Sequence, residues 1–556
     1  MMNTWFKSGT PWIWLNGGAV AVCMVMVVGL LGLIAVRGFG HFWAADVAEI
    51  EILDPQDGSR RLVLGEIVRS QQISAVVARD AGNVVPEGID LLSRYLIKQG
   101  NRDQTGRDFV WYTEVGMQPF RYPQNALVIE RREWGNFYGY PVKLVQDGED
   151  IPADSDRFWS TLLASVDRSV VLHDEIKAIE RRRIGRINTD IERLRLDARN
   201  LELRGVSGDE RLREESRIAQ RQAELSADYE VLRGELDLLY DSTRRDALTV
   251  RMDSGDEIDI SLATIVRVTT PNAMSVVGKM RQYLVRLWEF LTHDPREANT
   301  EGGIFPAIFG TVTMVFVMSI IVTPFGILAA IYLREYAPQN LMTRVIRISV
   351  YNLAGVPSIV YGVFGLGFFV YFLGGSIDQM FHQAKLPAPT FGTPGLFWAS
   401  LTLALLTLPI VIVSTEEGLA RIPTTIRQGS LALGATKAET LWKVVVPLAT
   451  PAMMTGLILA IARAAGEVAP LMLVGVVKLA ATLPVDGVFP YIHLERKIMH
   501  LGFHIYDVGF QSPNVEAARP LVYATALVLV FLIVVLNLSA ISIRNRLRER
   551  YRSASD

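Results

Sequence analysis

Six long apolar stretches constrain the fold of this chain more than any other feature of its sequence. The hydrocarbon core of a bilayer is about 30 Å thick, and a helix needs roughly 20 residues to cross it. Inside lipid, only helices and closed barrels satisfy their own backbone hydrogen bonds. The sequence therefore predicts a mainly α-helical, polytopic membrane protein with six transmembrane helices. The stretches cover residues 11–36, 304–333, 348–373, 396–414, 448–477 and 521–543.

The first stretch resembles a signal peptide only in part. Its apolar run is longer than a typical signal core, and no clear small-residue cleavage site follows it. We therefore expect residues 1–37 to form an uncleaved transmembrane anchor. Residues 301–556 would hold the other five helices, so that residues 38–300 form one large insertion outside the membrane.

The composition of the whole chain excludes several classes of protein. Its 56 basic and 58 acidic residues leave a net charge of -2, so no basic excess indicates nucleic-acid binding. A single cysteine, Cys23, excludes an internal disulfide framework and a cysteine-rich metal site. No cofactor is expected.

Both ends of the insertion are expected to contribute to one β-rich domain. Short alternating runs with turn signals occupy residues 46–150, for example at 49–53 and 126–130, and return at 245–272. At 276–291 the apolar spacing predicts an amphipathic helix that leads into the second transmembrane stretch.

The middle of the insertion, residues 160–242, has a different pattern. Apolar residues recur at four-three spacing on both sides of a turn signal at Gly205 to Gly208. With charged flanks, this pattern predicts two helices packed as an antiparallel coiled-coil hairpin. In the second helix the repeat comprises Ile218, Gln222, Leu225, Tyr229, Leu232, Leu236 and Leu239.

Lysine and arginine in short loops next to membrane helices mark the cytoplasmic side. We therefore expect both termini in the cytoplasm and residues 38–303 outside. The residues that indicate this orientation are Arg334, Arg344, Arg347, Arg421, Arg427, Lys437, Lys443, Arg544, Arg546, Arg548, Arg550 and Arg552.

Two charges interrupt the fifth apolar stretch. Arg463 and Glu467 are four residues apart, which would place them on one face of a helix. One interpretation is a buried ion pair that holds two helices together. The other is that Arg463 meets an anion crossing the membrane, since a guanidinium matches two oxygens of an oxyanion, while Glu467 orients the arginine.

The loop at residues 415–447 is patterned like a docking surface, although an ordinary surface hairpin is the alternative. Gly434 is expected to end a first short helix, and Thr436 to Glu439 form a capping-box pattern that starts a second one. We expect this second helix to stop before Pro447. The chain has no phosphate-binding loop of the form G-x-x-x-x-G-K-[ST], so it is not expected to be an enzyme that hydrolyses nucleotide.

These residues carry a resemblance to a family. The triplet Gln428-Gly429-Ser430, Gly434 and Pro447 are spaced as in the EAA loop of binding-protein-dependent ABC importer permeases, although the triplet itself departs from E-A-A. The runs at 462–471 and 355–362 are similar to those of PstA-type phosphate permeases. The large insertion departs from the short members of that family.

The resemblance implies one half of a phosphate pore in the cell inner membrane, with residues 38–303 in the periplasm. Its expected partners are a PstC-type permease, a PstB-type ATPase dimer and a PstS-type periplasmic phosphate-binding protein. Arg463 and Glu467 would line the substrate pathway. The ATPase would dock on the loop through Gln428, Gly429, Ser430, Gly434, Thr436, Glu439 and Pro447.

Other functions remain open at this stage. The alternative functions are the permease of an importer for another oxyanion, a secondary transporter, and a membrane-anchored sensor or scaffold that uses the coiled coil. His493, His500 and His504 gather in the last external loop, but no metal site is expected there because a supporting carboxylate arrangement is not evident.

Overall fold

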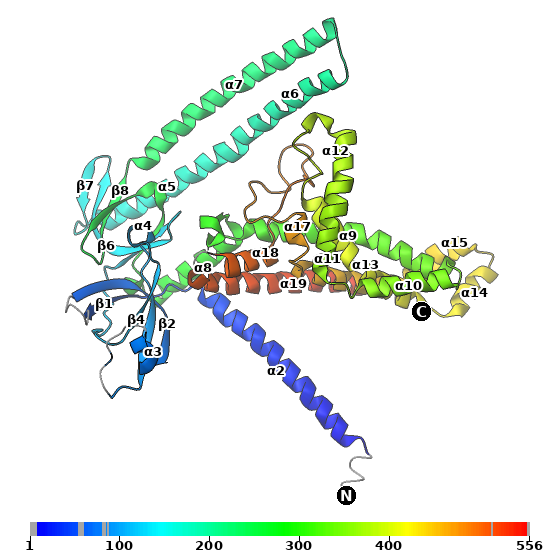
Figure 1. The fold of residues 1–556 in the computed structure, drawn as a ribbon, viewed down its shortest axis with the longest axis horizontal. Helices are drawn as coiled ribbons and strands as arrows, with labels where there is room; N and C mark the ends of the chain where they lie inside the picture. The colour runs from blue at the N-terminus through cyan, green and yellow to red at the C-terminus, as the bar shows by residue number, and fades with distance from the viewer. Residues whose placement is uncertain (1–7, 54–59, 81–84, 86–87, 513–514, 553–556) are drawn as a thin grey trace. The chain divides into compact units, whose positions relative to one another are not determined.

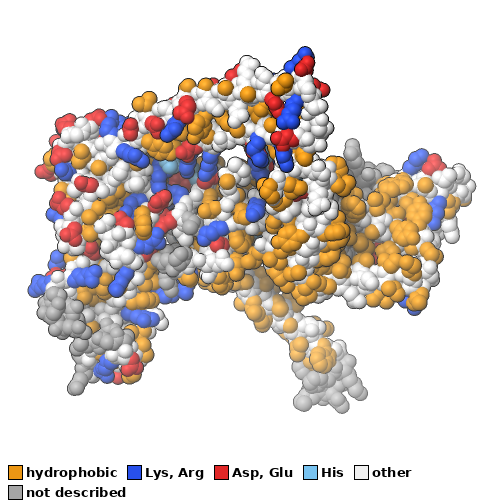
Figure 2. Space-filling model, turned by 45° about the horizontal axis from the view of Figure 1, so that its top comes forward, with side chains coloured by type: hydrophobic (Ala, Val, Ile, Leu, Met, Phe, Trp, Pro, Cys, Tyr) orange, Lys and Arg blue, Asp and Glu red, His pale blue; other side chains and the backbone are white. Residues whose placement is uncertain are grey.

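The computed structural model describes residues 8–53, 60–80, 85, 88–512 and 515–552. It divides into two compact units (Figure 1). The membrane unit comprises Met1–His41 and Phe290–Asp556, and the inserted domain comprises Phe42–Glu289. In the space-filling view, hydrophobic side chains dominate the surface of the membrane unit, whereas charged side chains are frequent on the inserted domain (Figure 2).

Six helices in the described part of the chain are long and apolar enough to cross a membrane, which confirms the expected number. They contain α2 (Thr10–Gly40), α9 (Phe305–Ile331), α11 (Ser358–Phe364), α13 (Leu396–Ala420), α16 (Val446–Gly466) and α19 (Val515–Arg552). With the π-helical and short helical segments that continue them, the spans are Pro11–Gly40, Phe305–Tyr336, Ser358–Phe381, Leu396–Ala420, Lys437–Gly466 and Ala518–Arg546.

Helix α13 is the centre of the membrane unit. It packs against α9 on one side and α16 on the other, around a buried apolar cluster that includes Met314, Leu403 and Ala460. Small residues allow these backbones to approach closely. A Cβ on Gly326 would lie 2.6 Å from the side chain of Val411, and one on Gly456 would lie 2.6 Å from Ser414.

The third and fifth spans differ most from the apolar stretches that predicted them. The third starts at Ser358, because Pro357 separates it from the amphipathic helix α10 (Leu341–Leu353); a residue before proline is disfavoured in a helix. In the fifth span α16 ends at Gly466, and Glu467 has an extended backbone. A separate short helix, α17 (Leu471–Val474), follows Pro470.

Two antiparallel sheets form the β-rich part of the inserted domain. The first has the strand order β1-β2-β3-β4 and the second β10-β5-β6-β8-β9, with β7 paired to β6. The runs expected at 49–53, 126–130 and 248–252 lie in β1, β5 and β8, so these strand predictions are confirmed. The bounds are β1 Val47–Leu53, β2 Arg60–Ser74, β3 Leu91–Lys98, β4 Phe109–Thr113, β5 Leu127–Arg131, β6 Asn136–Gln146, β7 Glu149–Pro152, β8 Ala247–Arg251, β9 Glu257–Ser261 and β10 Ile265–Thr269.

A long helical hairpin extends from this domain. Helix α5 (Phe158–Ala178) continues through a π-helical segment (Ile179–Ile184) into α6 (Gly185–Leu203), and α7 (Asp209–Arg244) returns. Ile176, Ile179 and Ile187 pack against Leu225, Leu232 and Leu236. Gly205 and Gly208 have positive φ angles at the tip, as a tight reversal requires. Whether the two helices supercoil as a coiled coil stays a prediction.

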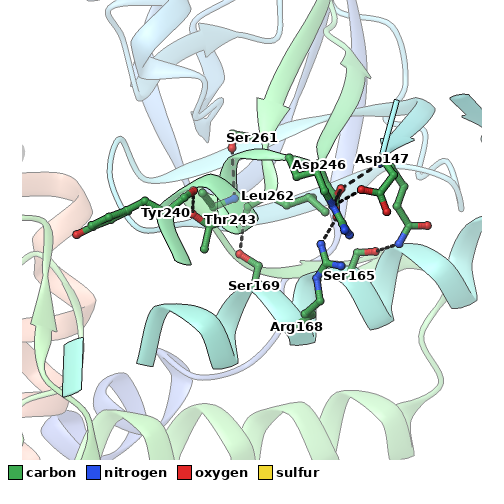
Figure 3. Close-up of polar contacts among 12 residues, drawn as sticks. Asp147, Ser165, Arg168, Ser169, Tyr240, Thr243, Asp246, Ser261 and Leu262 are labelled. Carbon is green, nitrogen blue, oxygen red and sulfur yellow. Dashed lines mark hydrogen bonds and ion pairs between the residues drawn. The ribbon is translucent and has the colours of Figure 1, made fainter. Parts of the chain in front are cut away.

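The base of the hairpin is part of the β domain. Phe158, Leu162 and Val166 of α5 are buried in the core of the second sheet. Figure 3 shows the polar contacts that hold this junction: the buried carboxylate of Asp246, just after α7, accepts a 2.5 Å hydrogen bond from Nη2 of Arg168. The first turns of the helical region expected at 160–242 therefore belong to the core of the second sheet. The part of the hairpin that extends away from the sheet begins after these turns.

Candidate translocation site and docking loop

Arg463 lies in the last turn of α16, and Glu467 follows the end of that helix. Nε of Arg463 donates a 3.2 Å hydrogen bond to Oε1 of Glu467. The Arg463 side chain is 35% exposed and that of Glu467 is 18% exposed. Within the described residues, the two terminal nitrogens of Arg463 have no protein partner. The carboxylate therefore holds the guanidinium by one edge and leaves its terminal nitrogens accessible.

The structure brings the runs 355–362 and 462–471 together at this point. A Cβ on Gly362 would lie 2.7 Å from Cα of Pro470, so only glycine allows α11 to pack so closely against the start of α17. The preceding residue, Tyr361, is buried and interacts electrostatically with Arg463. Its hydroxyl donates to the carbonyl of Leu353. The sequence reasoning did not select Tyr361, because nothing local marks a tyrosine as the neighbour of an arginine a hundred residues later.

Charged side chains also lie near the ends of the helical spans, outside the apolar stretches that the sequence defined, and Asp378 and Glu416 are two such carboxylates that are buried. Asp378 is buried near the end of the third span and accepts hydrogen bonds from the backbone of Phe391 and Gly392. Glu416, near the end of the fourth, accepts from Arg347. Both were missed because the apolar stretches are shorter than the helices. Their hydrogen bonds to the protein indicate structural roles.

The hydroxyl groups in the second span bond their own helix. Thr311 donates to the carbonyl of Ala307 and Thr323 to that of Ser319. Such local hydrogen bonds are the usual arrangement for hydroxyls in helices, and they make these threonines poor candidates for substrate contacts.

The patterned loop forms a helix, a tight turn and a second helix. Helix α14 (Thr424–Ala432) holds Gln428, Gly429 and Ser430, and Gly434 has φ +88° in the turn. The predicted capping box is confirmed: Thr436 and Glu439 cap each other's backbone at the start of α15 (Lys437–Thr440). Ser430 and Thr440 hydroxyls lie 2.8 Å apart and join the two helices.

The sequence predicted that the second helix of the loop stops before Pro447, and this prediction is wrong. It continues from α15 through a π-helical segment (Leu441–Val445) into α16, with Pro447 in the first turn of α16. Because the helix is continuous here, Pro447 removes one of its backbone hydrogen bonds, directly after the π-helical segment. The loop and the fifth span are therefore one continuous rod, which ends at Gly466 beside Glu467.

Ion pairs and hydrogen bonds brace the loop against the end of the second span. Arg427 donates to Oε1 of Glu335 at 2.9 Å and to the carbonyls of Leu419 and Ile422. Nζ of Lys437 donates to the carbonyl of Glu335. Glu335 lies in the π-helical segment (Tyr332–Tyr336) that continues α9. A force on the loop would therefore reach the second span as well as the fifth.

The tip of the loop exposes large apolar side chains. Leu433 is 91% exposed, and Leu431 and Trp442 are also exposed. Exposed apolar patches, unlike apolar residues scattered singly over a surface, are typical of protein–protein interfaces.

The three histidines His493, His500 and His504 have different surroundings in the structure. Among the described residues, no group of three or more His, Cys, Asp or Glu side chains lies close enough to hold a metal ion. His493 lies between Asp486 and Glu495, at 3.0 and 3.3 Å. His500 and His504 are buried, and this burial lowers the pKa of each to about 4. Both are therefore neutral at physiological pH.

Comparison with known proteins identifies the family. The family described as "Binding-protein-dependent transport system inner membrane component" matches residues 322–553, within the membrane unit. The phosphate transport system permease protein PstA of Mycobacterium leprae is 37% identical over 206 residues, which are 36% of this chain and 62% of that protein. PstA 1 of Mycobacterium tuberculosis is 34% identical over 251 residues, covering 44% and 70%. A probable PstA of Methanocaldococcus jannaschii is 31% identical over 221 residues, covering 39% and 67%.

The chain thus spans 62% to 70% of the length of these relatives. The family, the similar proteins and the six apolar helices agree with one another. The chain belongs to the PstA-type permeases of the binding-protein-dependent transport family: it is a non-enzymatic, multi-pass inner-membrane subunit of an ABC importer, which works with a separate ATPase and a substrate-binding protein.

Proposed function

We propose that this permease carries inorganic phosphate and that Arg463 contacts the anion during passage. The observation that carries the proposal is the partly exposed side chain of Arg463 at the end of α16, whose guanidinium is oriented by Glu467 and keeps its terminal nitrogens free. A guanidinium fork binds two oxygens of a tetrahedral oxyanion at once. The names of the similar proteins, which are phosphate permeases, support the same substrate.

Glu467 has two roles in this proposal. Its hydrogen bond to Nε fixes the plane of the guanidinium, so that less side-chain entropy is lost when an anion binds. Its negative charge also weakens the attraction between Arg463 and the anion. A permease needs moderate affinity for its substrate, because a substrate that binds too tightly is not released.

The partners follow from the same proposal. The chain would pair with a PstC-type permease to close the pathway, receive phosphate from a PstS-type binding protein, and bind a PstB-type ATPase dimer through the loop at 415–447. Both termini would lie in the cytoplasm and residues 38–303 in the periplasm. The exposed apolar tip at Leu433 and the continuous rod from Lys437 to Gly466 support the docking role, since ATPase movement would reach Glu467 directly.

The substrate is tested by transport. The complete importer in vesicles, energised with ATP, is expected to take up labelled phosphate, and unlabelled phosphate should compete more strongly than sulfate or molybdate. The control is the same assay without ATP. Uptake of sulfate or molybdate with phosphate ignored would show that the permease serves a different oxyanion.

The distal arm of the hairpin is expected to be dispensable for assembly. The packing described above assigns the base of α5 to the sheet core, so a sound deletion must spare it. Replacing residues 188–224 with a short glycine–serine linker keeps Ile176, Ile187 and Leu225. We expect normal assembly with the partner permease and, at most, altered coupling to the binding protein. Co-purification and ATPase stimulation by the binding protein measure the two effects, and loss of the partner permease would contradict the prediction.

A second variant tests whether the base of the hairpin, rather than its distal arm, is needed for the stability of the inserted domain. Arg168→Ala removes one charged partner of the buried carboxylate of Asp246. Breaking a buried pair of this kind costs up to about 3–5 kcal/mol, although the 39% exposure of Arg168 reduces this figure. This variant, unlike the arm deletion, is expected to lower the thermal stability of the inserted domain.

A further inference from the structure

Helix α8 (Val276–Thr292) exposes its apolar face and turns its polar face toward the protein, which is the reverse of the usual arrangement for a helix in water. Val277, Met280, Leu284 and Trp288 are all exposed, with exposed fractions of 79%, 48%, 58% and 65%. They are spaced by three or four residues, so they form one stripe along the helix. An amphipathic helix on a soluble domain normally buries such a stripe.

The opposite face of α8 is polar and faces the protein. Gln282 is buried, Lys279 forms an ion pair with Asp46, and Glu289 accepts a 2.5 Å hydrogen bond from Arg267. These contacts fix the rotation of the helix about its axis. The apolar stripe is therefore held outward by the fold, and a side-chain rearrangement would not hide it.

The chain places the end of α8 next to two membrane helices. The ring of Phe290, in its last turn, contacts the ring of His41, which directly follows α2, at 6.4 Å between centroids. The carbonyl of Phe290 accepts a hydrogen bond from the backbone N–H of Ile304, the residue before α9. The last turn of α8 thus lies where one transmembrane helix ends and the next begins.

We infer that α8 lies in the interface of the bilayer, with its exposed stripe in contact with lipid. A helix that is continuous with a membrane boundary and presents an outward apolar stripe gains free energy by burying that stripe among acyl chains. Trp288 and the nearby Trp43 and Tyr283, whose rings are 6.4 Å apart, suit the headgroup level, where tryptophan and tyrosine are enriched. Arg281, exposed beside the stripe, suits anionic headgroups.

This contact would anchor the inserted domain as well as the helix. The domain is joined to the membrane unit by the segment after α2 and by α8 itself. A third attachment, through lipid, would restrict the motion of the inserted domain without any protein partner. The inference does not depend on which anion is transported.

Nitroxide labels test the inference in the full chain within its native assembly. Val277 and Leu284 are each replaced by cysteine in a Cys23→Ser background and labelled after reconstitution in phosphatidylethanolamine–phosphatidylglycerol vesicles. The control is Val231→Cys on α7, the same residue type with 70% exposure. Collision rates with oxygen, which concentrates in lipid, and with a water-soluble nickel complex are measured by electron paramagnetic resonance.

The ratio of oxygen to nickel collisions is expected to be several-fold higher at 277 and 284 than at 231. Equal ratios at the three positions would show that the stripe faces water and would overturn the inference. Low collision rates with both reagents at 277 and 284 would show that another protein subunit covers the stripe, which also overturns it. Two label positions keep the test decisive if one variant fails to fold.

Discussion

Arg463→Gln is expected to abolish phosphate uptake while the protein still inserts and assembles. Glutamine keeps part of the length and polarity of the side chain but loses the charge and the fork of donors. A hydrogen bond to a charged group is worth about 1.5–3 kcal/mol, so losing even one slows uptake more than about tenfold. Uptake of labelled phosphate at matched membrane abundance measures the effect, and co-purification of the partner subunits confirms assembly.

The double variant Arg463→Leu/Glu467→Leu separates a transport role from a structural one. A pair kept only for stability can be replaced by apolar residues at little cost. If the pair is only structural, the double variant would transport phosphate almost normally. Near-normal uptake by this variant would therefore contradict the proposal. Glu467→Gln should impair uptake less than Arg463→Gln, because Glu467 acts on the arginine rather than on the anion.

The position of Glu467 also weakens the structural explanation. Two residues four apart within one helix can stabilise that helix, but Glu467 lies beyond the end of α16 with an extended backbone. The hydrogen bond therefore ties a helix end to the segment that follows. An arrangement of this kind orients the guanidinium at the end of the helix, where the side chain of Arg463 is 35% exposed.

Gly434→Leu is expected to prevent the ATPase from binding. The residue has φ +88°, a conformation that costs a side chain about 1–2 kcal/mol. Apart from its two chain neighbours, no described residue has an atom within 4 Å of a Cβ at this position, so a Cβ meets no obstacle when the permease is alone. A partner that fits closely against the tip at Leu433 would leave no room for a side chain. Co-purification of the ATPase with the permease measures the effect.

Gly205→Leu is the matched control for this experiment. Gly205 lies in the other helix–turn–helix tip of the chain, has φ +65° and also has no atom within 4 Å of its Cβ. The backbone penalty is therefore similar, but no docking role is proposed for that turn. If Gly434→Leu retains the ATPase at full occupancy and transports normally, as Gly205→Leu should, the proposed docking role is wrong.

Local sequence determined the elements of this protein. The apolar stretches predicted six membrane helices because lipid leaves a backbone few alternatives, and the capping box at Thr436 and Glu439 was legible because it needs residues only three apart. Alternation over a few residues likewise located β1, β5 and β8. Arg463 was selected because charge inside an apolar stretch is costly and therefore conspicuous.

Only the tertiary structure decided how these elements meet and where several of them end. Helix α16 ends at Gly466, although the apolar stretch continues beyond it. Its start is continuous with the second helix of the loop at 415–447. Tyr361 and Arg463, Arg427 and Glu335, and Arg168 and Asp246 are far apart in sequence. Such contacts depend on which surfaces pack together, and helix ends depend on that packing too. No periodicity within a segment encodes either, because the partner of each residue belongs to another segment.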